Sequence, residues 1–169
     1  MSDTELIEQA TTLLDLCRRK KLMIAAAESC TGGLLAATLT EIPGSSDVFE
    51  RGFVTYSNGA KTAMLGVPSQ TLQSFGAVSR ETAEAMARGA LARAPVALVA
   101  SITGIAGPGG GSSDKPVGLV HFAVAARSGR LAHREKRYGD IGRAQVRRVS
   151  VLEAMAMLSE LAETEPVSP

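Results

Sequence analysis

The sequence has few of the residues that mark nucleic-acid-binding proteins. It contains no tryptophan, two tyrosines and four phenylalanines among 169 residues, and its formal net charge is +1. It therefore has no excess of cations for a phosphate backbone, and aromatic residues for base stacking are scarce. The composition argues against direct nucleic-acid binding, and we expect no nucleic-acid partner.

Metal-binding and membrane-targeting signals are also absent from the sequence. Cys17 and Cys30 form no C-x-x-C pair and have no histidine at a zinc-site spacing, so neither a metal site nor a disulfide is predicted. No apolar run approaches about 18 residues, and residues 1–5 are acidic where a signal peptide is basic. We therefore expect a cytoplasmic protein that is not secreted and does not span a membrane.

Segments of strand character alternate with segments of helix character along the chain. Helices are predicted from Asp3 or Thr4 to 21, at about 31–41 and 60–65, after the N-cap Ser79, and at about 143–161. Strands are predicted at about 22–27, 53–56, 96–102, 117–126 and 130–138, the last two joined as a hairpin. This alternation predicts the α/β class: a three-layer α/β/α sandwich with a mixed sheet of about five strands.

The length of 169 residues suits one domain with a substantial core. The sequence contains no repeat and no interdomain linker, so a single domain over residues 1–169 is predicted. Its core spans about 6–161, and the end of the chain, 163–169, is expected to be mobile. The basic cluster 18–21 is interpreted as a solvated end of the first helix.

Three stretches that follow predicted strands are candidates for a site: 28–33, 56–61 and 103–111. In α/β sheets, ligands bind beyond the carboxyl ends of the strands. The three stretches meet in one site if their strands lie parallel and next to one another.

Ser29 lies in the first of these stretches, between a strand and a helix. Near a helix N-terminus, unpaired N–H groups and the positive end of the dipole favour developing negative charge, which suits a nucleophile. The same position suits a simple N-cap, because serine is preferred wherever a helix begins. Spacing alone leaves both interpretations open.

Lys61 is the candidate base for Ser29, because neither histidine is well placed. His121 lies within a predicted strand and His133 within a polar edge strand. A lysine can act as a base if burial lowers its pKa, and Ser–Lys pairs are a known variant of the catalytic triad. Tyr56, five residues earlier, is placed to orient the amine, although an ordinary surface lysine remains the alternative.

The glycine-rich stretch 103–111 matches no nucleotide-binding motif. A P-loop from Gly104 needs lysine at position 110, where Gly110 stands, and a dinucleotide fingerprint from Gly107 needs glycine at position 112, where Ser112 stands. The stretch is either a backbone surface that a ligand approaches closely or a flexible connector before the hairpin.

Several motifs, in order over about residues 6–161, resemble the CinA C-terminal domain family. They are Ala27-Glu28-Ser29-Cys30-Thr31-Gly32-Gly33, Tyr56-Ser57-Asn58 with Lys61, Gly76-Ala77-Val78-Ser79, Met86-Ala87, Thr103-Gly104-Ile105-Ala106-Gly107-Pro108-Gly109-Gly110 and Lys115-Pro116-Val117-Gly118. The resemblance implies an amidohydrolase that converts nicotinamide mononucleotide to nicotinate mononucleotide and ammonia in the pyridine nucleotide cycle. It also implies a homodimer, with no cofactor and no metal.

The resemblance assigns Ser29 as the nucleophile, Lys61 as its general base and Tyr56 as the residue that steadies the pair. An oxyanion hole is expected in the backbone N–H groups from Cys30 to Gly32. The residues expected to bind the substrate are Glu28, Cys30, Thr31, Gly32, Gly33, Thr103, Gly104, Gly107, Gly109 and Arg143.

One segment departs from the family pattern, which has Gly-Asp-Arg followed four residues later by a second arginine. Here Gly139-Asp140 is separated from Arg143 by two inserted residues, and Arg147 follows. With this insertion, Arg143 is either a ligand for the substrate phosphate or an ordinary helix-surface arginine. The chain also begins too late to contain the N-terminal pyrophosphatase domain of some relatives, so we expect that activity to be absent.

Two other functions remain open at the level of sequence. One is a non-catalytic interaction module linked to competence or DNA damage, as the historical naming of the family suggests. The other is an amidase that acts on a different small amide.

Overall fold

A five-stranded mixed sheet, in the order β2-β1-β3-β4-β5, forms the centre of the computed structural model, which describes residues 3–169. The strands are β1 (Ile24–Glu28), β2 (Phe49–Val54), β3 (Leu98–Gly104), β4 (Leu119–Ala126) and β5 (Leu131–Arg137). β1 pairs in parallel with β2 and with β3, whereas β3–β4 and β4–β5 are antiparallel. The predicted α/β class, with a hairpin in a mixed sheet, is confirmed; residues 1–2 of the predicted domain lie outside the described residues.

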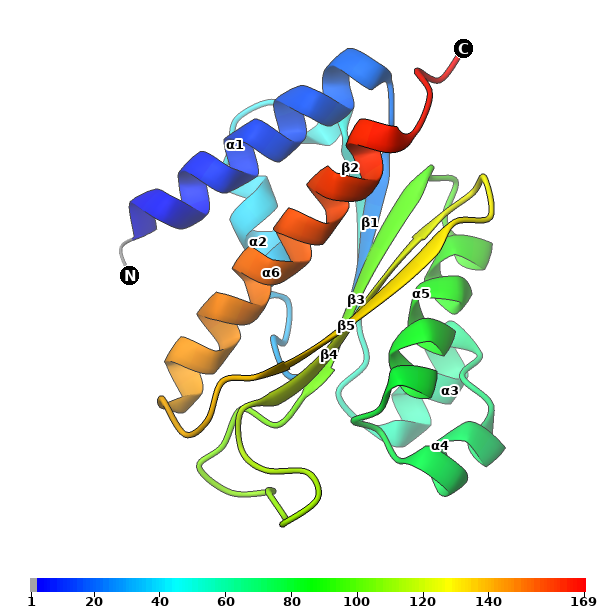
Figure 1. The fold of residues 1–169 in the computed structure, drawn as a ribbon. Helices are drawn as coiled ribbons and strands as arrows, with labels where there is room; N and C mark the ends of the chain where they lie inside the picture. Colours follow the sequence, from blue (N-terminus) through cyan, green and yellow to red (C-terminus); the bar gives the residue numbers. More distant parts are fainter. Residues whose placement is uncertain (1–2) are drawn as a thin grey trace.

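Helices cover both faces of this sheet and so form three layers (Figure 1). One face carries α1 (Asp3–Lys20), α2 (Leu34–Thr40) and α6 (Arg143–Thr164), and the other carries α3 (Asn58–Leu65), α4 (Ser69–Phe75) and α5 (Arg80–Arg93). A short 3₁₀ helix, Ser45–Asp47, precedes β2. None of the helices in residues 3–169 combines the length and the apolar character needed to cross a lipid bilayer.

The core follows from the alternation of side chains along the strands. In β3, Leu98 and Ala100 pack under α1 and α6, while Val99 faces the opposite cluster with α3 and α5. Helix α5 approaches α3 closely because it carries glycine at the contact: a Cβ on Gly89 would lie 1.9 Å from the Leu65 carbonyl oxygen. This close contact fixes α3 against the sheet.

The strand connections create a crevice at one end of the sheet. After β1 the chain passes to α2 on one face, and after the neighbouring β2 it passes to α3 on the other face (Figure 1). Ligands bind where the connections of adjacent parallel strands diverge in this way. Since β1, β2 and β3 are parallel and adjacent, the condition for the three candidate stretches to meet is fulfilled.

Several local predictions were wrong. Strand β2 spans Phe49–Val54 where 53–56 was predicted, and α2 begins at Leu34, three residues after the predicted start. Helix α4, Ser69–Phe75, was not predicted, and none of its residues is buried.

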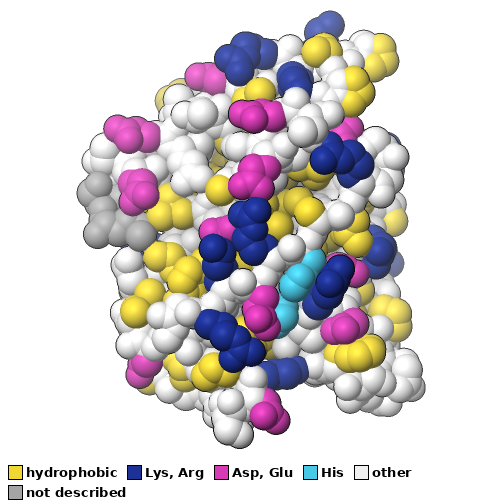
Figure 2. All heavy atoms as spheres, in the orientation of Figure 1, with side chains coloured by type: hydrophobic (Ala, Val, Ile, Leu, Met, Phe, Trp, Pro, Cys, Tyr) yellow, Lys and Arg dark blue, Asp and Glu magenta, His cyan; other side chains and the backbone are white. Residues whose placement is uncertain are grey.

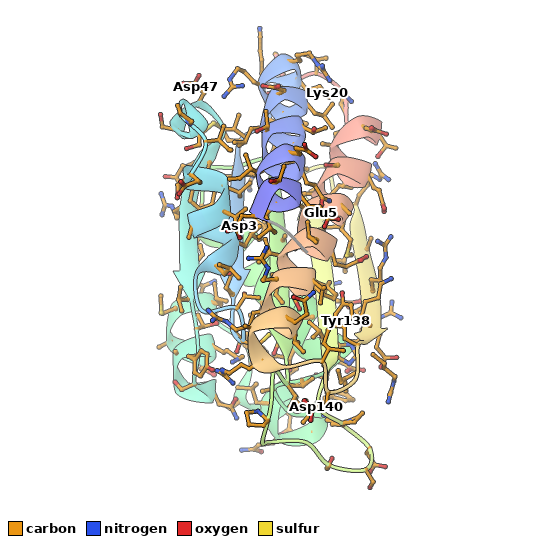
Figure 3. All side chains as sticks on the ribbon, turned by 90° about the vertical axis from the view of Figure 1, so that its left-hand side faces the viewer. Asp3, Glu5, Lys20, Asp47, Tyr138 and Asp140 are labelled. Carbon is orange, nitrogen blue, oxygen red and sulfur yellow. The ribbon has the colours of Figure 1, made fainter. Side chains whose placement is uncertain are left out.

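The basic cluster at the end of α1 is more than a solvated helix end. The Lys20 ammonium donates to the carbonyl oxygens of Ala162, Glu163 and Glu165, at 2.7, 2.7 and 2.6 Å. Figure 3 shows Lys20 at the C-terminal end of α1, beside the C-terminal part of α6. Helix α6 continues to Thr164, beyond the predicted end at about 161. Lys20 therefore joins the ends of two helices that lie far apart in the sequence.

Candidate active site

Ser29 follows β1 directly and is held by the backbone on both sides. Its N–H donates to the Ile102 carbonyl oxygen at 3.0 Å, and its own carbonyl accepts from the Gly32 N–H at 2.9 Å, which closes a tight turn. Gly32 and Gly33 have φ angles of +57° and +102°, a conformation that favours glycine. The side chain of Ser29 is thereby presented beyond the sheet, and α2 begins only at Leu34.

The N-terminus of α2 is capped by Glu28. Its carboxylate accepts from the N–H groups of Leu35 and Ala36 at 2.8 and 3.1 Å, and the residue is 1% exposed. A negative charge here complements the helix dipole. The interpretation of Ser29 as the N-cap is therefore wrong, and the hydroxyl of Ser29 is not used as a cap.

Lys61 lies on α3, whose first turn is capped by the Ser57 hydroxyl accepting from the Ala60 N–H. The lysine is 1% exposed, and its Nζ lies 2.9 Å from Ser29 Oγ and 2.9 Å from the Thr55 carbonyl oxygen. Burial disfavours the ammonium form and lowers the pKa of Lys61 below its ordinary value. The alternative of an ordinary surface lysine is therefore wrong.

A cavity of about 250 Å³ lies in front of the Ser29–Lys61 pair. Its lining, all in the described part of the chain, contains no carboxylate, and Arg143 contributes a guanidinium cation. The cavity therefore favours an anionic ligand. It is lined by Ser29, Cys30, Tyr56, Lys61, Ala77, Val78, Thr103, Gly104, Ile105, Ala106, Gly107, Gly109, Gly110 and Arg143.

Four residues expected to bind the substrate lie outside this cavity lining. The Glu28 carboxylate is occupied by the cap of α2, and Thr31, Gly32 and Gly33, which follow Cys30 in the chain, do not line the cavity. The glycine-rich loop does line the cavity, and the Thr103 hydroxyl, 1% exposed, donates to the Ala77 carbonyl oxygen at 2.7 Å. Two larger hollows, of about 540 and 550 Å³, lie over α3, α4 and α5 and include neither Ser29 nor Lys61.

Tyr56 stands at the mouth of the cavity and contacts Arg143. The side chain of Tyr56 is largely exposed, and its hydroxyl accepts from one guanidinium nitrogen of Arg143 at 2.6 Å. The other terminal nitrogen of Arg143 donates to the Gly107 carbonyl oxygen at 2.8 Å. The group that holds the Lys61 amine beside Ser29 is the Thr55 carbonyl, not the Tyr56 phenol. Despite the two residues inserted before it, Arg143 lines the cavity.

The family model described as the CinA C-terminal domain matches residues 6–162. This chain belongs to the CinA C-terminal domain family. A competence/damage-inducible protein from Agrobacterium tumefaciens, named CihA, has a crystal structure that matches with a TM-score of 0.92 at 55% identity, covering 93% of this chain and 95% of that one.

Two curated relatives of this CinA C-terminal domain have different names and lengths. A putative competence-damage inducible protein of Caldicellulosiruptor bescii is 52% identical over 125 residues, which are 74% of this chain and 30% of that protein. A protein of Enterobacter agglomerans named nicotinamide-nucleotide amidohydrolase PncC is 47% identical over 131 residues, covering 78% of this chain and 80% of that protein. The chain thus spans about a third of the length of the first relative and most of the second.

The two histidines of this CinA C-terminal domain lie away from the cavity. His121 on β4 and His133 on β5 are joined by a ring-nitrogen hydrogen bond of 2.9 Å, and neither lines the cavity. Figure 2 shows the histidine side chains at the surface between cationic and acidic groups. The described residues 3–169 contain no cluster of His, Cys, Asp and Glu arranged to hold a metal ion.

Cys30 lines the cavity beside Ser29, and burial keeps its thiol protonated. Burial raises the pKa of its thiol to about 12, so the thiolate is scarce at neutral pH. Cys17 is a core residue of α1, and burial raises its pKa to about 11.

Sequence reasoning gave no role to several residues that shape the site. Ala77, Val78, Ile105, Ala106 and Gly110 line the cavity. All five belong to motifs on which the family resemblance rests, so the sequence marked these segments but not the role of each residue.

Proposed function

We propose that this chain hydrolyses the carboxamide of nicotinamide mononucleotide, giving nicotinate mononucleotide and ammonia. The observation that carries the proposal is the buried Lys61 amine, 2.9 Å from Ser29 Oγ, at a cavity whose lining has no carboxylate and includes the Arg143 guanidinium. The relative named nicotinamide-nucleotide amidohydrolase, 47% identical over most of both chains, supports the choice of substrate.

In the first half of the reaction, Ser29 Oγ attacks the carboxamide carbon while neutral Lys61 takes the hydroxyl proton. The neutral amine keeps an N–H for the Thr55 carbonyl and has a lone pair for this proton. The tetrahedral intermediate collapses to an ester on Ser29, and the C–N bond breaks as Lys61 returns the proton to the departing ammonia.

In the second half, water attacks the ester carbon and gives its proton to Lys61. The carboxylic acid is released and the proton returns to Ser29 Oγ. The negative oxygen in both halves is stabilised by N–H groups of the turn after Ser29. Cys30 lines the cavity, and within the described residues its N–H donates to no other backbone group, which supports this role.

The substrate phosphate is placed beside Arg143. The guanidinium now donates to the neutral acceptors Tyr56 and Gly107, and a phosphate is a stronger partner for it. Gly104, Gly107 and Gly109 leave the backbone accessible to the nucleotide. Tyr56 then acts at the mouth of the cavity by orienting Arg143.

The direct test measures ammonia released from nicotinamide mononucleotide by the purified chain. We expect release by the wild type and loss of at least about a hundredfold in Ser29→Ala and Lys61→Ala. Ser46→Ala and Lys136→Ala, at residues outside the cavity lining, are the matched controls and should keep wild-type activity. Undiminished release from Ser29→Ala would refute the serine mechanism.

The same assay on a panel of small amides separates the alternatives. Ammonia from another amide, with none from nicotinamide mononucleotide, would retain the Ser–Lys chemistry and change the substrate. No ammonia from any amide would favour a non-catalytic interaction module, the alternative suggested by the competence and damage names of several relatives.

A further inference from the structure

Arg147 contacts the turn after Ser29 from helix α6, outside the lining of the cavity. It lies on α6, and one of its guanidinium nitrogens donates to the Thr31 carbonyl oxygen at 2.9 Å. The same nitrogen packs against Gly32, where an added Cβ would lie 3.6 Å from it. Arg147 does not line the cavity, so it has no place in direct substrate binding.

The turn that Arg147 contacts carries the proposed oxyanion hole. Its first residue, Ser29, is fixed to β3 through the Ile102 carbonyl, and its last N–H, of Gly32, donates back to Ser29. The peptide between Thr31 and Gly32 is therefore held at its N–H by Ser29, and its carbonyl accepts both from Arg147 at 2.9 Å and from the Leu34 N–H at 3.0 Å. Removing Arg147 leaves the Thr31 carbonyl with the Leu34 N–H alone, so the turn is held less tightly and the orientation of the Cys30 N–H changes.

Two arginines on α6 hold the two walls of the site. Arg143 and Arg147 are four residues apart and so share one face of the helix. Arg143 donates to the glycine-rich loop at Gly107, whereas Arg147 donates to the serine turn at Thr31. The start of α6 thus sets the distance between these walls, and the positive charge of Arg147 lies on the turn where negative charge develops.

We infer that Arg147 is a positioning residue that holds the turn after Ser29 in the geometry of an oxyanion hole. The inference rests on the proposed serine mechanism. An oxyanion hole stabilises the transition state and contributes little to ground-state binding, so loss of Arg147 lowers kcat and leaves KM nearly unchanged.

The test compares Arg147→Met, Arg147→Gln and Arg147→Lys with the wild type. Arg148→Met, a change at the next residue of the same helix, is the control and keeps wild-type kcat. We expect kcat for ammonia release to fall roughly 10–100-fold in the Met and Gln variants, with KM within about twofold. Arg147→Lys keeps part of the kcat that the other two variants lose, because its ammonium can also donate to the Thr31 carbonyl. Equal melting temperatures establish that the fold is intact, and if the Met variant does not fold, the Gln and Lys variants decide.

A second measurement monitors the reactivity of the Ser29 hydroxyl in the absence of the substrate. The rate of phosphonylation by a small fluorophosphonate, read by intact mass, falls in parallel with kcat in Arg147→Met. The apparent pKa of the acid limb of kcat/KM stays at the wild-type value, because the contacts of Lys61 are untouched. A merely structural defect that displaced Lys61 would move that limb.

Three results would overturn the inference: unchanged kcat and labelling in a folded Arg147→Met variant, a rise in KM at unchanged kcat, or a shifted acid limb. If the wild type releases no ammonia from nicotinamide mononucleotide, the proposed substrate fails. The labelling rates still decide the role of Arg147 in that case.

Discussion

Lys61 illustrates how burial favours a neutral amine beside a serine hydroxyl. A lysine that is 1% exposed loses most of its hydration, so the fold favours the neutral amine. The Thr55 carbonyl gives that amine one acceptor, and Ser29 Oγ lies at the same distance of 2.9 Å. No carboxylate lines this cavity to restore the charge, so Lys61 is available to accept a proton.

The first prediction concerns the protonation of Lys61. Because its pKa is lowered, the neutral form appears at a lower pH than for an ordinary lysine, and kcat/KM rises as pH increases through that pKa and stays high above it. Lys61→Arg keeps a cation but has a guanidinium that does not lose its proton, so we expect a loss of about 10²–10⁴-fold. The measurement is the pH profile of ammonia release. An Arg variant with the wild-type profile would contradict a lysine base.

Glu28 shows why residue roles inside a motif are difficult to assign from sequence. It stands next to the proposed nucleophile, and the family resemblance places it with substrate-binding residues. In the structure its carboxylate binds the N–H groups of Leu35 and Ala36, seven and eight residues later. This cap depends on two left-handed glycines, Gly32 and Gly33, that delay the start of α2. The delay is a property of the folded turn and not of the residue types.

At the scale of whole elements, the sequence predicts best where burial is continuous. β1, β3 and β4 are uncharged or nearly uncharged runs covered on both faces, and each was predicted within a few residues. β2 is an edge strand with no buried residue, and the exposed helix α4 has none either. Neither element has an apolar face that the sequence pattern could reveal.

The hairpin of β4 and β5 carries a pair of histidines, His121 and His133, in contact with each other. The rings of His121 and His133 stack at a centroid distance of 5.2 Å. Burial, more than any charge, lowers the pKa of both histidines, and their mutual proximity lowers the pKa of His121 further. Arg80 and Lys115 act in the same direction, while Glu81, Glu84 and Glu135 oppose them.

The second prediction follows from these lowered pKa values. In the unfolded chain the histidines bind protons at about pH 6.5, whereas in the folded protein they bind protons only at lower pH. The unfolded state therefore gains more protons, and the free energy of unfolding decreases as pH falls below about 6.5. We expect a smaller decrease between pH 7.5 and 5.5 in His133→Gln, which removes one titrating ring. Urea titrations at the two pH values measure the difference. Equal pH dependence of the two proteins would show that the pair does not control acid stability.

At the scale of the whole molecule, the contact between Ser29 and Lys61 depends on connections that the sequence indicates only in outline. The alternation of strands and helices predicts parallel strands, and parallel strands bring Ser29 and Lys61 to the same end of the sheet. The contact between their side chains, however, needs α2 and α3 on opposite faces and α3 pressed against α5 at Gly89. Those conditions come from packing between segments that are distant in the sequence, and hydrophobic periodicity does not predict such packing.

The last prediction concerns the tie between the ends of α1 and α6. Lys20 donates to three carbonyl oxygens at the C-terminal end of α6, where a cation also complements the helix dipole. These partners are 142 to 145 residues away in the chain, which is why the sequence pattern alone indicated a solvated helix end.

We expect Lys20→Met to lower the free energy of unfolding by about 1–2 kcal/mol, measured by urea denaturation, because the carbonyls lose a charged donor. Arg19→Met, at an exposed neighbour, is the matched control and should change stability by less than about 0.5 kcal/mol. The tie lies at the end of the sheet opposite the Ser29 cavity, so kcat should be unchanged in both variants; equal stabilities of the two variants would show that the Lys20 contacts contribute nothing to the fold.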